Sequence, residues 1–230
     1  MPSAGRNVAR IHLPVSSHLR LPAARPAKAA SWAAALALVA ALLCVGTVAA
    51  GADKYWTDGS GQWDVSDNWT PSGQPQAGDE VYLTESDATN RTVTYYNTTN
   101  PGDLLNSLRV DATGAGAMTL NMPTDHALSV TEEYVGYNGK GAVTQSAGTN
   151  NAAVLYLGYS AASNGSYSIS GGRLSSSDTE WIGYSGTGIL NIQNGGQVSN
   201  RTGFLGGNSG STGTVTVDGI GSKWTNSSRL

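Results

Sequence analysis

Three regularly spaced tyrosines are the residues of this sequence best suited to binding chemistry. Tyr137, Tyr159 and Tyr184 each follow a glycine in a hydrophobic-Gly-Tyr motif. If these motifs stack in successive repeats, the three phenol rings form an outward ladder along one face, and such a strip could bind a glycan by stacking. Rings that pack on one another from repeat to repeat explain the same residues without a ligand. We favour this structural interpretation.

The carboxylates give less support for catalysis. Enzymes that cleave polysaccharides on a β-helix need clustered carboxylates and a basic residue on one face. Asp178 and Glu180 have serine, asparagine or glycine as partners in the repeat register. Glu132 and Glu133 are neighbours and would point to opposite faces of a strand. We expect all four to be solvated surface charges. With His126 as the single histidine beyond residue 52, no triad is predicted and the chain is not predicted to be an enzyme.

No metal site or cofactor is predicted either. The calcium-binding nonapeptide of β-rolls needs the pattern Gly-Gly-x-Gly-x-Asp, and the double glycines at 171–172, 195–196 and 206–207 lack its aspartate. Cys44 is the single cysteine and lies in an uncharged segment near the N-terminus. The chain beyond it therefore has no thiol for a disulfide or a thiolate metal site.

The chain beyond residue 52 is acidic. It holds all 16 acidic residues and eight of the 13 basic residues, a formal net charge of −8. Such a surface repels phosphate backbones, so nucleic acid is not predicted as a partner.

A repeat of about two dozen residues organises the sequence and must position these side chains. Its clearest marker is a column of glycines at Gly116, Gly141, Gly165, Gly188 and Gly213. Nine of the ten residues that lie two and four positions after these glycines are apolar, with Gln145 as the exception. This alternation is the pattern of a half-buried strand. Further columns contain the hydrophobic-Gly motifs at Val135, Leu157, Ile182 and Leu205, with Val110 as a degenerate member, and the residues Leu128, Leu174, Val198 and Trp224.

Short repeats of this kind cannot bury their apolar side chains alone, but stacking makes a continuous core. The fold predicted is therefore all-β, a parallel β-helix or solenoid of roughly five rungs over residues 107–230. Residues 53–106 are predicted to form an N-terminal Trp-rich β cap, with Trp56, Trp63 and Trp69 covering the first rung. The pattern calls for another strand where the sequence reaches Leu230, which predicts a longer natural protein.

The N-terminal residues 1–52 are predicted to be a helical signal peptide. An uncharged segment, 29–52, follows a region with five basic residues, which is the order found in secretory signals. Small residues allow cleavage after Ala50 or Ala52. The same uncharged segment could span a bilayer, so an uncleaved anchor that holds the protein in the inner membrane, facing the periplasm, is the alternative.

Two parts of the chain resemble the passenger repeats of bacterial autotransporters and related surface proteins. The first is 210–227, GSTGTVTVDGIGSKWTNS, together with 182–188, IGYSGTG; the second is the opening segment with its three tryptophans and 78–83, GDEVYL. The resemblance implies a right-handed parallel β-helix outside the cell, secreted or associated with the outer membrane. It also implies a role in adhesion to a glycan or a host or cell surface, and membrane contact only through the N-terminal segment or a C-terminal barrel that this sequence lacks.

The leading functional hypothesis is therefore an exported structural or adhesin-like scaffold without catalytic activity. A carbohydrate-binding or carbohydrate-cleaving β-helix is the second hypothesis, with Tyr137, Tyr159 and Tyr184 as its binding residues. A membrane-tethered periplasmic solenoid is the third.

Overall fold

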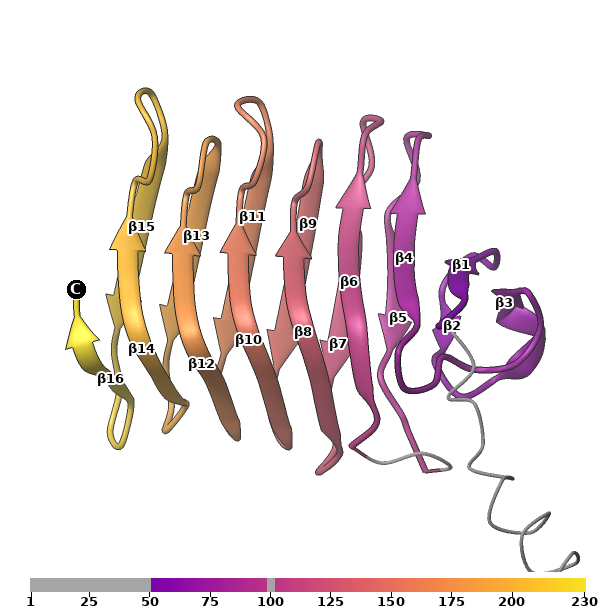
Figure 1. Ribbon diagram of the computed structural model, residues 1–230, viewed down its shortest axis with the longest axis horizontal. Helices are drawn as coiled ribbons and strands as arrows, with labels where there is room; N and C mark the ends of the chain where they lie inside the picture. The colour runs from indigo at the N-terminus through magenta and orange to yellow at the C-terminus, as the bar shows by residue number, and fades with distance from the viewer. Residues whose placement is uncertain (1–50, 99–101) are drawn as a thin grey trace, which may run out of the picture. The chain divides into compact units, whose positions relative to one another are not determined.

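The structure is a computed structural model that describes residues 51–98 and 102–230, and these residues form a parallel β-solenoid of about seven turns (Figure 1). From β4 (Glu80–Glu85) onward, successive strands alternate between two sheets. In spatial order, the nine-stranded sheet contains β16 (Lys223–Arg229), β14 (Gln197–Leu205), β12 (Arg173–Ile182), β10 (Thr149–Leu157), β8 (Ala127–Val135), β6 (Leu104–Ala112), β4 (Glu80–Glu85), β1 (Asp53–Trp56) and β3 (Trp69–Thr70). The seven-stranded sheet contains β15 (Thr212–Val217), β13 (Thr187–Ile192), β11 (Asn164–Ile169), β9 (Lys140–Gln145), β7 (Met118–Met122), β5 (Arg91–Thr94) and β2 (Gly61–Gln62).

The predicted all-β solenoid is confirmed, and it has more turns than the roughly five expected. Strands β4 and β5 pair in parallel with β6 and β7, so the stack already begins within the segment that the sequence assigned to a cap. The repeat was hard to recognise there because that segment lacks the hydrophobic-Gly-Tyr motif.

The glycine column is correct for four of its five members. One register position holds a glycine in successive turns, at Gly141, Gly165, Gly188 and Gly213. The expectation for Gly116 was wrong, because Met118 is the residue that pairs with Gly141. A shift of two residues leaves every side chain on the same face of the strand. The apolar side chains of β7 are therefore still buried, as expected.

The second column is confirmed in full, including Val110. Val110, Val135, Leu157, Ile182 and Leu205 pair in register across β6 to β14. The glycine that follows has a positive φ, for example 69° at Gly158. A Cβ atom at Gly158 would also overlap the backbone carbonyl of Thr187. Conformation and close packing of the turns both require glycine here.

The third column is confirmed, but the turn between its predicted members contributes a polar residue. Asn150 pairs with both Leu128 and Leu174, and it is fully buried. Asn150 is therefore one of several polar side chains that lie inside the solenoid.

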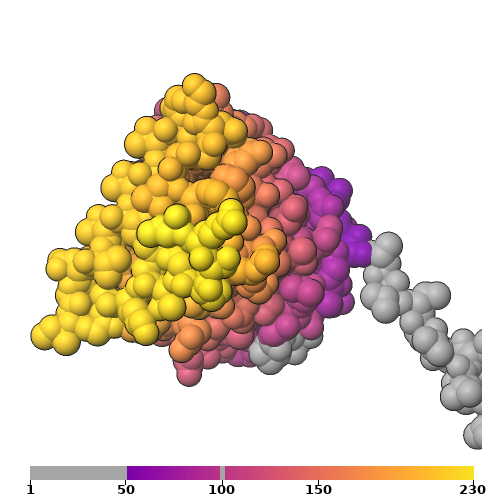
Figure 2. Space-filling model, turned by 60° about the vertical axis from the view of Figure 1, so that its left-hand side comes forward, coloured from indigo at the N-terminus to yellow at the C-terminus, as the bar shows by residue number. Residues whose placement is uncertain are grey.

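The two ends of the described solenoid differ. At the N-terminal end, Trp56, Trp63 and Trp69 are each at most 4% exposed and pack edge to face, beside a single turn of 3-10 helix, η1 (Ser66–Asn68). The prediction of a tryptophan cover is confirmed. The C-terminal turn, yellow in Figure 2, leaves Val217 48% and Ile220 99% exposed. A search of the described residues finds no helix long and apolar enough to span a membrane.

Candidate functional site

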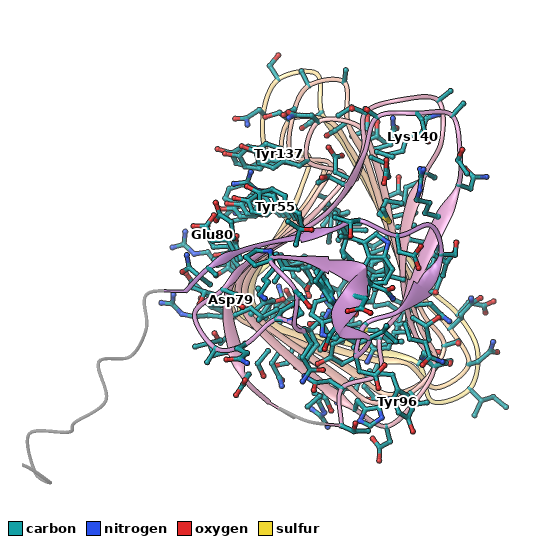
Figure 3. The ribbon with its side chains drawn as sticks, turned by 90° about the vertical axis from the view of Figure 1, so that its right-hand side faces the viewer. Tyr55, Asp79, Glu80, Tyr96, Tyr137 and Lys140 are labelled. Atoms are coloured by element: carbon teal, nitrogen blue, oxygen red, sulfur yellow. The ribbon has the colours of Figure 1, made fainter. Side chains whose placement is uncertain are left out.

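The tyrosines singled out from the sequence do form a ladder. Tyr137, Tyr159 and Tyr184 lie in the turns that follow β8, β10 and β12. Their ring centroids are 4.9 and 5.1 Å apart, and the planes of successive rings differ by 7° and 13°. We call these three residues the turn ladder; Figure 3 shows Tyr137 at the end of this stack.

A second ladder runs beside it and was not predicted from the sequence. One outward register position of the nine-stranded sheet holds the residues of what we call the strand ladder, namely Tyr55, Tyr82, Arg109, Tyr134, Tyr156, Trp181 and Phe204. Three pairs of this ladder, Tyr55 with Tyr82, Tyr134 with Tyr156 and Trp181 with Phe204, are stacked with centroid distances from 4.1 to 4.9 Å. A recognisable signal exists, because an aromatic residue directly precedes the hydrophobic-Gly motif in four turns.

The two ladders contact each other through ring edges. Tyr134, for example, packs edge to face against Tyr137 and Tyr159, with centroids 5.3 and 5.1 Å apart. Where two rings stack within a ladder, each covers a face of the other, so mainly edges and hydroxyl groups meet solvent there. The ends are more open: Tyr55 is 43% and Phe204 40% exposed. A sugar that stacks on an aromatic face would find few faces free along this surface.

Carboxylates accompany the N-terminal part of the strand ladder. The phenol of Tyr82 donates a hydrogen bond of 2.8 Å to Glu80, and that of Tyr134 donates one of 2.8 Å to Glu132 (Figure 3 labels Glu80). Burial and, second, the bond to Glu80 raise the pKa of Tyr82 to about 12. These phenols therefore stay protonated at neutral pH and act as donors, a structural use of the carboxylates.

Two other carboxyl groups lie inside the solenoid, which corrects the expectation that they are surface charges. Glu133 and Glu180 are both 0% exposed. They occupy one inward register position, in which the successive turns contribute Leu108, Glu133, Leu155, Glu180 and Gly203. Glu132 is partly exposed and Asp178 is exposed, so the expectation of surface charges is met for these two residues alone.

Glu133 is the centre of a buried polar cluster. Asn150 donates from Nδ2 to both oxygens of Glu133, at 3.2 and 2.9 Å, and the same atom lies 3.1 Å from the hydroxyl of Tyr167. Tyr167 donates to Gln145 over 2.7 Å. Burial raises the pKa of Glu133 to about 7, although the bond from Asn150 acts in the opposite direction. The folded state therefore favours the neutral carboxylic acid.

Glu180 has its own partners two turns further on. It accepts hydrogen bonds from Ser176 at 3.1 Å and from the indole of Trp224 at 3.2 Å. The indole is also 3.1 Å from Asn200 Oδ1. Burial raises the pKa of Glu180 to about 7 as well. Both acids are enclosed by the wall of the solenoid, so a substrate outside it cannot reach them.

The remaining residues considered from the sequence stand apart from these clusters. His126 packs edge to face on Tyr96, with centroids 4.7 Å apart. Over residues 51–98 and 102–230, no three His, Cys, Asp or Glu side chains converge as a metal site would require. The expected cleavage residue Ala50 and most of the expected signal peptide lie outside the described residues. Ala52 is described, and its backbone N–H donates to Asp79 over 2.8 Å.

The chain matches no protein-family model, no curated protein and no solved structure at a significant level. The solenoid fold therefore stands on the geometry alone.

Proposed function

We propose that this protein is an exported, non-catalytic β-solenoid that serves as a structural, adhesin-like scaffold outside the cell. The observation that carries the proposal is the use of its aromatic residues: the faces of both ladders pack against neighbouring turns and so stabilise the solenoid. The raised-pKa carboxyl groups, which would be the first candidates for acid–base catalysis, are enclosed in its core.

The resemblance to autotransporter passengers and the signal-like N-terminus support export. The hydrogen bonds at Ala52 refine the expected cleavage position. Its N–H bonds to Asp79, and its carbonyl accepts from Glu80 at 3.0 Å. Cleavage after Ala50 keeps both bonds, whereas cleavage after Ala52 removes them. We therefore favour Gly51 over Asp53 as the first residue of the mature protein. The tethered alternative, in which residues 29–52 remain attached, keeps both bonds and is separated from cleavage by experiment.

Export is tested with the full chain in a bacterium with two membranes, with an epitope inserted in the exposed turn between Ala161 and Ala162. We expect antibody to reach the epitope on intact cells or in the medium, and N-terminal sequencing to begin at Gly51. Intact protein in the inner-membrane fraction would favour the tether instead. Protein confined to the cytoplasm would refute export.

The glycan-stacking role of the turn ladder is tested separately. If the ladder is only structural, the double variant Tyr159→Ala/Tyr184→Ala unfolds at a lower temperature than the unchanged protein. Its retention on glycan-coated surfaces is the same as that of the unchanged protein. Tyr159→Phe is the control that keeps the ring and removes its hydroxyl. Selective loss of glycan retention by the double variant, with unchanged stability, would establish the carbohydrate-binding alternative at these residues.

A further inference from the structure

A groove opens on the outer surface at the N-terminal end of the turn ladder. It encloses about 360 Å³, and the residues of its lining that matter here are Tyr82, Thr84, Arg109, Asp111, Tyr137 and Asn138. This volume lies within the range of small-molecule sites, about 300–1,000 Å³. It is also far larger than a simple ion requires.

The groove exists because two turns lack the residues that continue the turn ladder. Thr84 and Asp111, which pair with each other, follow the column residues Leu83 and Val110, where later turns have a glycine. Strands β4 and β6 run on to Glu85 and Ala112 instead of turning outward at this point. No tyrosine therefore precedes Tyr137 in the ladder, and space is left beside it.

Arg109 interrupts the strand ladder at the same level. The central carbon of its guanidinium lies 4.6 Å from the ring centroid of Tyr137 and 5.0 Å from that of Tyr82. These rings hold the cation in place. None of the described residues gives Arg109 a hydrogen-bond acceptor or a carboxylate partner in the structure, and its buried Nε is without a partner. A guanidinium has five N–H donors in a planar fork that matches a carboxylate.

The carboxylates of the groove, in contrast, are already engaged. Asp111 accepts backbone hydrogen bonds from Asn138 at 3.1 Å and Gly139 at 2.8 Å. Glu85 lies 3.4 Å from the guanidinium of Arg91. Arg109 is thus the charged group of the groove whose N–H donors are available to a ligand. Around it stand the hydroxyl groups of Thr84, Ser86 and Thr113 and the amide of Asn138.

We propose that this groove binds an acidic saccharide, with the sugar carboxylate on the guanidinium of Arg109 and the sugar hydroxyls on the hydroxyl and amide groups of the lining. A planar fork held between aromatic rings fits a carboxylate, and polar side chains at several positions fit a polyhydroxylated ring. The overall negative charge of the chain argues against unselective attraction of anions. The inference goes beyond the scaffold function, because the polar groups of the groove bind the sugar, while the ladder rings Tyr82 and Tyr137 hold only the guanidinium.

The probes are oligogalacturonate and its neutral counterpart, a galactose oligomer, titrated into the purified full chain by calorimetry. We expect oligogalacturonate to bind and the neutral oligomer to bind at least tenfold more weakly. Arg109→Tyr fills the gap in the strand ladder, so it should fold well while losing at least tenfold in affinity. Arg109→Lys keeps the charge without the fork and should fall between the two. The matched control is Arg201→Gln, which changes another surface arginine, paired with Asp178 at 3.0 Å.

Any of five results would overturn the proposal. Four of them are no binding of oligogalacturonate at millimolar concentration, equal binding of the neutral oligomer, equal weakening by Arg201→Gln, and unchanged affinity in a folded Arg109→Tyr. Full displacement by sulfate at a concentration equal to that of the saccharide would mark a simple anion site and would likewise refute a saccharide. Circular dichroism and thermal unfolding of each variant separate lost binding from lost folding.

Discussion

The outer and inner faces of the same strands use acidic and aromatic side chains in different ways. On β8, Glu132 and Tyr134 point outward, and Tyr134 stacks on Tyr156 of the next turn with centroids 4.9 Å apart. Glu133 lies between them in sequence and points into the core. Outside, aromatic rings follow one another through successive turns, because flat rings stack well at the spacing of neighbouring strands, about 4.8 Å.

The inner face follows a different rule. Glu133 and Glu180 are separated by the turn that carries Leu155, so the two carboxyl groups never occupy neighbouring turns. Carboxylates on adjacent turns would repel each other strongly in a core. In this solenoid, aromatic rings thus occupy successive turns on the outer face, whereas the buried carboxyl groups of Glu133 and Glu180 are separated by a turn without one.

The largest expected effect is a loss of stability as the pH rises. The two buried acids have pKa values of about 7 in the folded state, above the 4.5 expected in the unfolded chain. Folding therefore favours the protonated form. The contribution of these two acids to stability is fully present below about pH 4.5, is lost between about pH 4.5 and 7 and is absent above that, a loss of about 3 kcal/mol for each acid. Urea unfolding at pH 4.5, 6 and 8 measures this difference.

The control for this titration is the variant Glu133→Gln/Glu180→Gln, which keeps shape and polarity but cannot ionise. Exposed groups such as Asp87, whose pKa is lowered mainly by its bond to Arg91, remain in both proteins and cancel in the comparison. A double variant as dependent on pH as the unchanged protein would contradict the account.

The next largest effect is the difference in stability between alanine substitutions at neighbouring residues on the two faces of β10. Leu155→Ala removes a fully buried side chain and should lower the free energy of unfolding by about 2–5 kcal/mol. Tyr156→Ala removes one outward ring of the strand ladder and should lower it by about 1–2 kcal/mol, mainly through lost ring contacts. Urea unfolding at pH 5 compares them. A larger effect at Tyr156 would make the surface ladder, rather than the core, the main source of stability.

A single substitution on the inner face should raise the free energy of unfolding at alkaline pH. Glu133→Gln removes the penalty of ionising a buried acid, and Asn150 can offer its buried, unpartnered Oδ1 to the new amide. We expect a gain of about 2 kcal/mol at pH 8 and little change at pH 4.5, measured by thermal and urea unfolding. Equal effects at both pH values would exclude ionisation as the cause.

The smallest effect is expected where the outer ladder is interrupted. Arg109→Tyr restores a ring between Tyr82 and Tyr134 and should raise the free energy of unfolding by about 1 kcal/mol. Arg109→Ala, which removes the cation without adding a ring, should lower it slightly. A destabilised Arg109→Tyr would show that the guanidinium, with its contacts to three rings, is the better packed residue.

The sequence predicted most of the fold and only part of the surface. Period, apolar columns and the tryptophan cover were recognisable because each turn repeats the same local pattern. The register of Gly116 was not, because a shift of two residues preserves the alternation. Glu133 could have been placed inside by stepping back two residues from Val135. Glu180 could have been placed in the same way by stepping back two residues from Ile182, because the register irregularity of β12 lies upstream, between Ser176 and Thr179.

The groove at Arg109 lay beyond sequence reasoning for a different reason. Residues from three turns line it, and its space depends on two missing tyrosines rather than on any motif. A tyrosine that is missing from an irregular repeat cannot be noticed in the sequence until the register of the strands is known.

The most direct test of the account is a carbon-13 NMR titration of the glutamate carboxyl groups. Assignment follows from the single variants Glu133→Gln and Glu180→Gln, each of which removes one resonance. We expect those two resonances to titrate near pH 7, well above the pKa of about 4.3 of an unperturbed glutamate. If Glu133 and Glu180 titrate near that unperturbed value instead, they are solvated, and the enclosed acid column is wrong.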